Sequence, residues 1–128
     1  MRNVFFLLVL LGGGSWWYAS HKFDFADLMG YAKKNAAAPW APTAEYSVGM
    51  IYYQRADYPK AQEAFAQLLA DYPTGQYEAS GLLRLSEVAE RNNDVPAARQ
   101  ALEQFLADFP DSPDRPIAER RKELLYNR

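Results

Sequence analysis

The sequence contains no cysteine and one histidine among its 128 residues. The absence of cysteine excludes disulfides, thiolate nucleophiles, thiolate metal sites and a lipid-bearing cysteine near the N-terminus. The histidine, His21, borders an apolar segment and has no second ligand at a metal-site spacing. The glycine cluster Gly12 to Gly14 lies inside that segment and does not follow a strand, so it is not a phosphate loop. We therefore expect no enzymatic activity, no cofactor and no small-molecule substrate.

The sequence also lacks a strong charge of either sign. Its 14 basic and 16 acidic residues give a formal net charge of −2 at pH 7. Within residues 23–110, 12 acidic and 7 basic residues leave a net charge of −5, which argues against a nucleic-acid partner. Hydrophobic residues make up 49% of the chain and aromatic residues 15%. That content is enough for a packed core, so extensive disorder is not expected.

One long uncharged run extends from Val4 to Ala19. As a helix this run would span about 24 Å, slightly less than the roughly 30 Å hydrocarbon core of a bilayer. The run ends on Trp16, Trp17 and Tyr18, residue types that collect at the membrane interface. The pattern predicts an uncleaved transmembrane anchor over residues 1–20, in contact with the lipid bilayer. A cleaved signal peptide and a soluble buried helix are the alternatives.

The short tail before the apolar run is typical of a signal anchor. This predicts a single-pass topology, with the N-terminus in the cytoplasm and the folded body in the periplasm. The flanking charges are nearly balanced, with Arg2 on one side and His21 and Lys22 on the other. Small residues within a membrane helix let a second helix approach closely. We therefore predict a role in transmembrane packing for Gly12, Gly13 and Gly14.

The chain repeats one pattern 37 positions apart. DYPKAQEAFAQLLADYP (residues 57–73) and DVPAARQALEQFLADFP (residues 94–110) are identical at nine of 17 positions. Each follows a stretch with helical spacing of apolar residues, so each unit reads as two helices separated by a proline-marked turn. Such repetition predicts an all-α stack of helix pairs. The second helices should bury Ala61, Ala64, Phe65, Leu68 and Leu69, and Ala98, Ala101, Leu102, Phe105 and Leu106.

The pattern resembles the tetratricopeptide repeat (TPR) over residues 42–113. The matching positions are Gly49, Tyr52, Tyr58, Ala61, Phe65 and Pro73, then Leu82, Ser86, Ala89, Ala98, Leu102 and Pro110. The resemblance implies that Gly49 and Ser86 lie where two helices cross, with Ala61 and Ala98 opposite. One departure is Glu45, where a large apolar residue is usual.

The repeats are similar to those of bacterial envelope proteins, namely the Tol-Pal coordinator family and the outer-membrane assembly lipoproteins. This implies a binding role in the bacterial envelope. Both ends of the repeat stack need covering. Residues 114–128, with Ile117, Leu124 and Leu125 among many charges, are predicted to form a capping helix. Residues 21–41 are predicted to form a juxtamembrane helix followed by a proline-rich connector, which Trp40 pins to the domain.

A partner-binding groove is predicted along the first helices of the two pairs. Aligning the repeats places six side chains there, Tyr46, Met50, Tyr53, Leu83, Glu87 and Glu90. We expect an aromatic-rich surface that suits an apolar helix or an extended segment. TPR domains that clamp the C-terminus of a chaperone present Lys, Arg and Asn at such positions. None of these residues is matched here, so we do not expect a carboxylate-clamp role. Alternatively, the juxtamembrane residues Phe23 and Phe25 fill the groove.

These observations predict a membrane-anchored TPR scaffold that binds other membrane or envelope proteins. One alternative is a permanent accessory subunit of a large integral-membrane complex, including an energy-converting one. Another is a signal-cleaved, soluble periplasmic adaptor.

Overall fold

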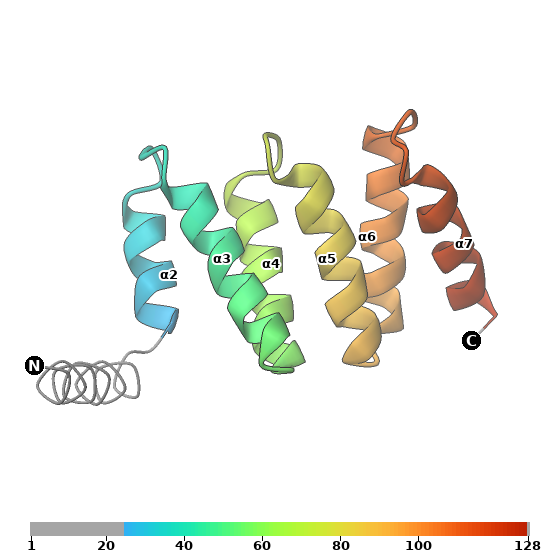
Figure 1. Cartoon of the computed structure of the whole chain (residues 1–128), viewed down its shortest axis with the longest axis horizontal. Helices are drawn as coiled ribbons and strands as arrows, with labels where there is room; N and C mark the ends of the chain where they lie inside the picture. Colours follow the sequence, from blue (N-terminus) through green and yellow to red (C-terminus); the bar gives the residue numbers. More distant parts are fainter. Residues whose placement is uncertain (1–24, 128) are drawn as a thin grey trace, which may run out of the picture.

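The computed structural model describes residues 25–127, and every regular element in that range is a helix. The helices lie side by side in chain order and form one row (Figure 1). They are α2 (Phe25–Lys34), α3 (Ala41–Gln54), α4 (Tyr58–Asp71), α5 (Glu78–Arg91), α6 (Val95–Asp108) and α7 (Arg115–Tyr126). The predicted all-α stack of helix pairs is therefore confirmed for the described part of the chain.

No helix between residues 25 and 127 is long and apolar enough to cross a bilayer. The anchor predicted over residues 1–20 lies outside the described residues, and so do its aromatic and glycine positions. The membrane span, the interface role of Trp16, Trp17 and Tyr18 and the packing role of the glycines stay predictions.

The 37-residue period reappears in the helix boundaries. Helices α3, α5 and α7 begin at residues 41, 78 and 115, whereas α2, α4 and α6 end at residues 34, 71 and 108. The pairs α3–α4 and α5–α6 are called the first unit and the second unit below. Positions 37 residues apart are called equivalent. By this register, α2 corresponds to the second helix of a pair and α7 to the first helix of a pair. Each end of the row is therefore covered by a single helix.

The turn inside each unit is built in the same way. The N-cap carboxylates of Asp57 and Asp94 each accept a hydrogen bond from the backbone N–H three residues on, at 3.5 and 3.2 Å. Proline stands in the first turn of both following helices, where its missing N–H costs nothing. The residues before the caps, Ala56 and Asn93, both have a φ of 58°. This left-handed conformation suits Asn better than Ala.

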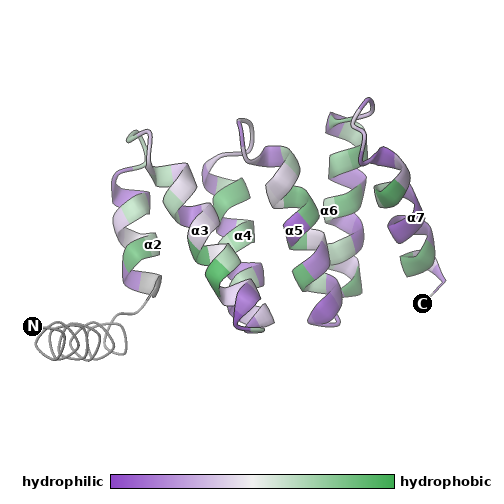
Figure 2. Cartoon of the chain, viewed as in Figure 1, coloured by the Kyte–Doolittle hydropathy of each residue, from purple (hydrophilic) through white to green (hydrophobic). Residues whose placement is uncertain are grey.

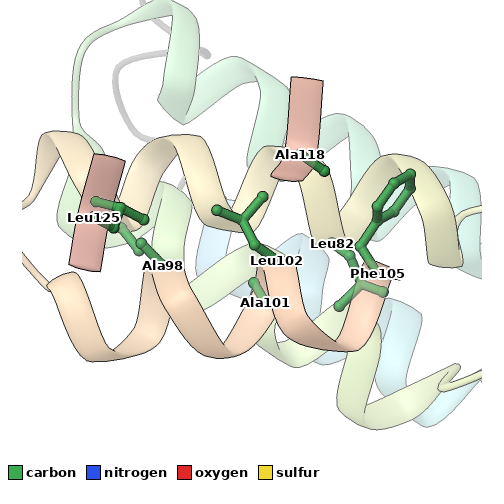
Figure 3. Packing of buried hydrophobic residues seen from close by; sticks show 8 residues of the cluster. Leu82, Ala98, Ala101, Leu102, Phe105, Ala118 and Leu125 are labelled. Carbon is green, nitrogen blue, oxygen red and sulfur yellow. The ribbon is translucent and has the colours of Figure 1, made fainter. Parts of the chain in front are cut away.

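The buried apolar side chains form two clusters. The first consists of Val48, Tyr52, Ala61, Ala64, Phe65, Leu68 and Val88. The second consists of Leu82, Ala89, Ala98, Ala101, Leu102, Phe105, Ala118 and Leu125 (Figure 3). Each cluster takes residues from the helix after its own unit, α5 for the first and α7 for the second. One pair cannot bury its own apolar surface, so the next helix completes the core.

Gly49 lies where α3 crosses the Phe65 ring of α4. A Cβ added there would be 2.7 Å from the Phe65 ring, which is closer than non-bonded carbons pack. We expected Ala61 opposite Gly49, but the nearest atoms belong to Phe65. A wide aromatic ring, rather than a second small residue, fills the space that the glycine leaves.

Helix α2 covers the N-terminal end of the first unit, as predicted. Its Ala32 is fully buried, and Leu28 and Met29 pack against the first cluster. The proline-rich connector, predicted over residues 36–42, occupies residues 35–40, because α2 ends at Lys34 and α3 already begins at Ala41. Trp40 stacks on Tyr31 of α2, with ring centroids 5.6 Å apart. It therefore fixes the connector to the covering helix.

Helix α7 covers the other end and is amphipathic (Figure 2). Ala118 and Leu125 are buried against the second unit, whereas Ile117 and Leu124 are each 59% exposed. The residues equivalent to the buried Leu82 and Ser86 of α5 are Glu119 and Glu123, and both are exposed. The face of α7 where a following helix would pack is therefore charged, which suits a solvated cap.

Candidate protein-binding groove

A groove extends over α3, α5 and α7, the first helices of the pairs. Its volume is about 590 Å³, and its walls are formed by Tyr53, Arg84, Glu87, Glu90, Arg91, Asn93 and Arg121. We call this surface the A-helix groove. It is more charged than the sequence led us to expect, with three arginines and two glutamates among the lining residues.

Arg84 of α5 is one of the three arginines that line the A-helix groove. Its Nη1 is 3.2 Å from Oε2 of Glu87, and its guanidinium carbon is 5.7 Å from the centroid of the Tyr53 ring. Burial alone would lower the pKa of Arg84, but hydrogen bonding to Tyr46 and the negative charge of Glu87 outweigh it and raise the pKa. The side chain is a permanent cation held between a carboxylate and an aromatic face.

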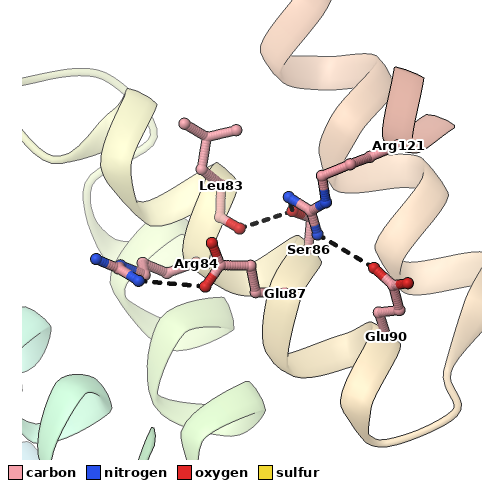
Figure 4. Close-up of polar contacts among 6 residues, drawn as sticks. All are labelled: Leu83, Arg84, Ser86, Glu87, Glu90 and Arg121. Atoms are coloured by element: carbon pink, nitrogen blue, oxygen red, sulfur yellow. Dashed lines mark hydrogen bonds and ion pairs between the residues drawn. The ribbon is translucent and has the colours of Figure 1, made fainter. Parts of the chain in front are cut away.

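Arg121 ties the covering helix α7 to α5 (Figure 4). Its Nη1 donates to Oγ of Ser86 at 3.0 Å, and its Nη2 donates to Oε2 of Glu90 at 3.3 Å. The fully buried Ser86 donates its own hydroxyl proton to the Leu83 carbonyl at 2.6 Å. Serine at this position therefore serves as a polar anchor for α7 in addition to packing as a small residue.

The charges of the groove do not cancel. Three arginines and two glutamates line it, which leaves an excess of one positive charge. The third arginine, Arg91, lies over the Tyr58 ring at 5.6 Å. A guanidinium carries five N–H donors, and the observed pairings of Arg84 and Arg121 use only some of them. The groove can therefore donate further hydrogen bonds to carboxylates or carbonyl groups of a bound segment.

Of the six predicted groove residues, Tyr53, Glu87 and Glu90 line the A-helix groove. Tyr53 also packs against the first cluster. Tyr46, Met50 and Leu83 are partly buried and pack against the two apolar clusters. Tyr46 stacks on Tyr77 with centroids 4.7 Å apart, so its ring contributes to the joint between the two units. The alternative occupants Phe23 and Phe25 lie outside the residues whose side chains are described.

The sequence reasoning missed Arg84, Arg91, Asn93 and Arg121 as groove residues. They stand at positions other than the carboxylate-clamp positions, which are occupied by Tyr46, Met50, Leu83 and Glu87. A signal was present, because Arg84 and Arg121 are 37 residues apart and therefore equivalent. It was overlooked because α7 was treated as a solvating cap and not as a third wall of the groove.

Residues 25–127 contain no group of three or more His, Asp or Glu side chains that could hold a metal ion. The groove side chains are suited to recognition by charge, hydrogen bonding and aromatic contact.

The comparisons with known proteins agree with this architecture. The family described as YfiO, outer membrane lipoprotein, matches residues 40–118, a segment that runs from the residue before α3 into α7. The match covers more than half of the 128 residues, and the chain belongs to this family. No match was found among curated proteins. The predicted resemblance to an envelope protein with helical repeats is confirmed. The sequence nevertheless contains no cysteine that could carry a lipid.

Proposed function

We propose that this protein is a membrane-anchored adaptor of the bacterial envelope, which holds a protein partner in the A-helix groove. The observation that carries the proposal is the groove itself, lined by three helices and bearing an aromatic ring, guanidinium groups and carboxylates. Aromatic and arginine side chains are enriched where proteins bind one another. Membership of an outer-membrane lipoprotein family supports an envelope location.

The two halves of the groove select different features of a partner. Over α3, the ring of Tyr53 offers an aromatic contact. Over α5 and α7, Arg84, Arg91 and Arg121 offer hydrogen-bond donors with an excess of one positive charge. A helix or extended segment with an apolar portion followed by acidic or carbonyl-rich residues satisfies both halves.

The attachment that we propose for the adaptor is not lipidation, since the sequence contains no cysteine. We propose that residues 1–20 form a single-pass anchor, with the helical repeats in the periplasm. The support is the uncharged run that ends in Trp16, Trp17 and Tyr18.

We propose binding without catalysis. The groove walls are Tyr, Arg, Glu and Asn side chains, without a nucleophile beside a general base. Ser86 is close to Arg121, but it is fully buried and its hydroxyl is bonded to a backbone carbonyl.

Affinity purification of the full chain from native membranes in mild detergent, with quantitative mass spectrometry, tests the proposal. Tyr53→Ala and Arg84→Ala should each weaken the association by about 1–3 kcal/mol. Arg84→Ala should keep its stability within about 1 kcal/mol. Tyr53→Ala also removes packing against the first cluster, so its association is measured at a temperature at which circular dichroism shows the variant folded.

Arg115→Ala is the matched control. Arg115 also forms a helical ion pair, with Glu119 at 2.8 Å, but it lies outside the groove lining. The control should retain the partner in full. Equal retention by all three variants, or equal loss from all three, would contradict binding in the A-helix groove.

A further inference from the structure

The first unit buries a carboxylic acid where the second unit buries leucine. Glu45 of α3 has no exposed surface, and the equivalent Leu82 of α5 is 6% exposed. No N–H or O–H group donates to either oxygen of the Glu45 carboxyl. An isolated buried carboxylate is very costly, so this residue requires a specific explanation.

The neighbour of Glu45 is another carboxyl group, that of Asp71 at the end of α4. One Asp71 oxygen accepts a hydrogen bond from Gln67 at 2.8 Å, and the other is buried without a donor. Two carboxylates can only accept hydrogen bonds, but a single proton turns one of them into a donor. That proton would satisfy the buried oxygens of both residues.

Three helical segments and the connector meet at this acid pair. From α2, Lys33 contributes a positive charge near Glu45, although its own side chain is exposed. At the end of α4, the Tyr72 hydroxyl donates to the carbonyl of Ala36 in the connector at 3.1 Å. The pair therefore lies where α2 and its connector are attached to the first unit.

We propose that Glu45 and Asp71 share one proton and act as a proton-dependent latch that joins α3 to the end of α4, where the connector from α2 is attached. With the proton in place, the pair is hydrogen-bonded and carries a single negative charge, opposite Lys33. Without it, two carboxylates repel each other in a buried space, with only one exposed cation nearby. Admitting water would relieve that repulsion by solvating both carboxylates.

The electrostatics agree with this geometry. Burial is the largest cause that raises the pKa of Glu45, to about 8, and the hydrogen bond and negative charge of Asp71 add to it, while Lys33 opposes it. Burial and the charges of Glu45 and Asp71 also raise the pKa of the adjacent Tyr72 hydroxyl. The latch is therefore closed at neutral pH and opens as the pH rises through about 8.

The second unit supplies an internal control. Asp108, equivalent to Asp71, also has an acidic neighbour, Glu78, and accepts a hydrogen bond from Gln104. Neither acid is buried in this case, because Glu78 is partly exposed and Asp108 is exposed. Water can solvate both carboxylates, so this second acid pair should not affect the packing of any helix.

Trp40 reports on the latch because it stacks on Tyr31 of α2. In the full chain in mild detergent, with Trp16→Phe and Trp17→Phe, Trp40 is the remaining tryptophan. Its emission would be followed from pH 6.5 to 9.5 in this background and in three further variants. These are Glu45→Leu, which installs the residue of the second unit, Asp71→Asn, and the control Glu78→Gln.

We expect a Trp40 transition with a midpoint near pH 8 in the background and in Glu78→Gln. Glu45→Leu should abolish it. Asp71→Asn should move it to lower pH, since an amide donates to the Glu45 carboxylate and removes one negative charge. A flat background curve, or the same transition in Glu45→Leu, would overturn the latch. Should Glu45→Leu not fold, as judged by circular dichroism, an unchanged midpoint in Asp71→Asn would overturn it.

Discussion

The two units have the same arrangement of helices but place different residues where the helices cross. Gly49 and Phe65 in the first unit are replaced by Ser86 and Leu102 at the equivalent positions of the second. The first unit combines the smaller Gly49 with the larger Phe65, whereas the second combines the larger Ser86 with the smaller Leu102. Dense packing explains this, because volume added on one side of a crossing must be removed from the other. The repeat therefore conserves the space at the crossing rather than the residues.

The groove surfaces of the units differ without such compensation. Ser47 and Met50 of α3 are replaced by Arg84 and Glu87 at the equivalent positions of α5. Ser47 is exposed and Arg84 and Glu87 line the groove, although Met50 also packs against the first cluster. Packing therefore constrains these positions less than it constrains the crossings. The comparison indicates that the crossings are constrained by packing, whereas the groove surface is adjustable toward a partner.

The largest effect should come from removing the aromatic ring at the crossing of the first unit. Phe65 is fully buried, and Phe65→Ala should lower the free energy of unfolding by about 3–5 kcal/mol. The equivalent Leu102→Ala removes fewer atoms and should cost roughly 2–5 kcal/mol. Chemical denaturation of both variants at one pH measures the two values. A loss near zero for either residue would show that the assigned register is wrong.

The buried acid should make the first unit sensitive to pH. The folded-state pKa of Glu45 is raised from 4.5 to about 8, so the folded chain binds more protons than the unfolded chain between these values. The free energy of unfolding contributed by Glu45 is therefore fully present below pH 4.5 and is lost as the pH rises through about 8.

Glu45→Leu should remove this loss. Its gain in stability over the natural chain should grow with pH and reach the order of a few kcal/mol at pH 9, at about 1.4 kcal/mol per unit of pKa shift. Denaturation at several pH values measures the difference. A gain that does not change with pH would contradict the buried acid as its cause.

The packing comparison can be tested by exchanging residues between the units. Gly49→Ser alone should cost about 1–3 kcal/mol, because the new side chain meets the Phe65 ring. Adding Phe65→Leu recreates the pair found in the second unit and should recover part of that loss beyond the sum of the single changes. A double-mutant cycle measures the coupling, and strict additivity would contradict compensation at the crossing.

The smallest effect concerns the turn before the second helix. Ala56 and Asn93 share a φ of 58°, a conformation that Asn adopts more readily than Ala. Ala56→Asn should therefore raise the free energy of unfolding by about 0.5–1 kcal/mol. The reverse exchange, Asn93→Ala, should lower it by a similar amount. Thermal unfolding of both variants gives the comparison, and equal signs would refute it.

The repeats could be predicted from the sequence because two similar segments occur 37 residues apart. Proline and aspartate marked both turns, and the apolar spacing identified the buried faces of α4 and α6 around residues such as Phe65 and Leu102. Glu45 was recognised as a departure, but its burial against Asp71 depends on two helices meeting at one point. The groove was predicted only in part. Tyr53 and Glu87 lie on its walls, but Arg121 also lines it and comes from α7, which was predicted only as a capping helix.

Site-specific photo-crosslinking in native membranes tests the central claim most directly. A photoreactive residue would replace Tyr53 or Glu87 in the A-helix groove, and Glu63 or Gln100 on the exposed surfaces of α4 and α6 as controls. Partner binding in the groove predicts one common adduct from the two groove positions and none from the two controls. An adduct formed only from Glu63 or Gln100 would place the partner on the second helices and contradict the account.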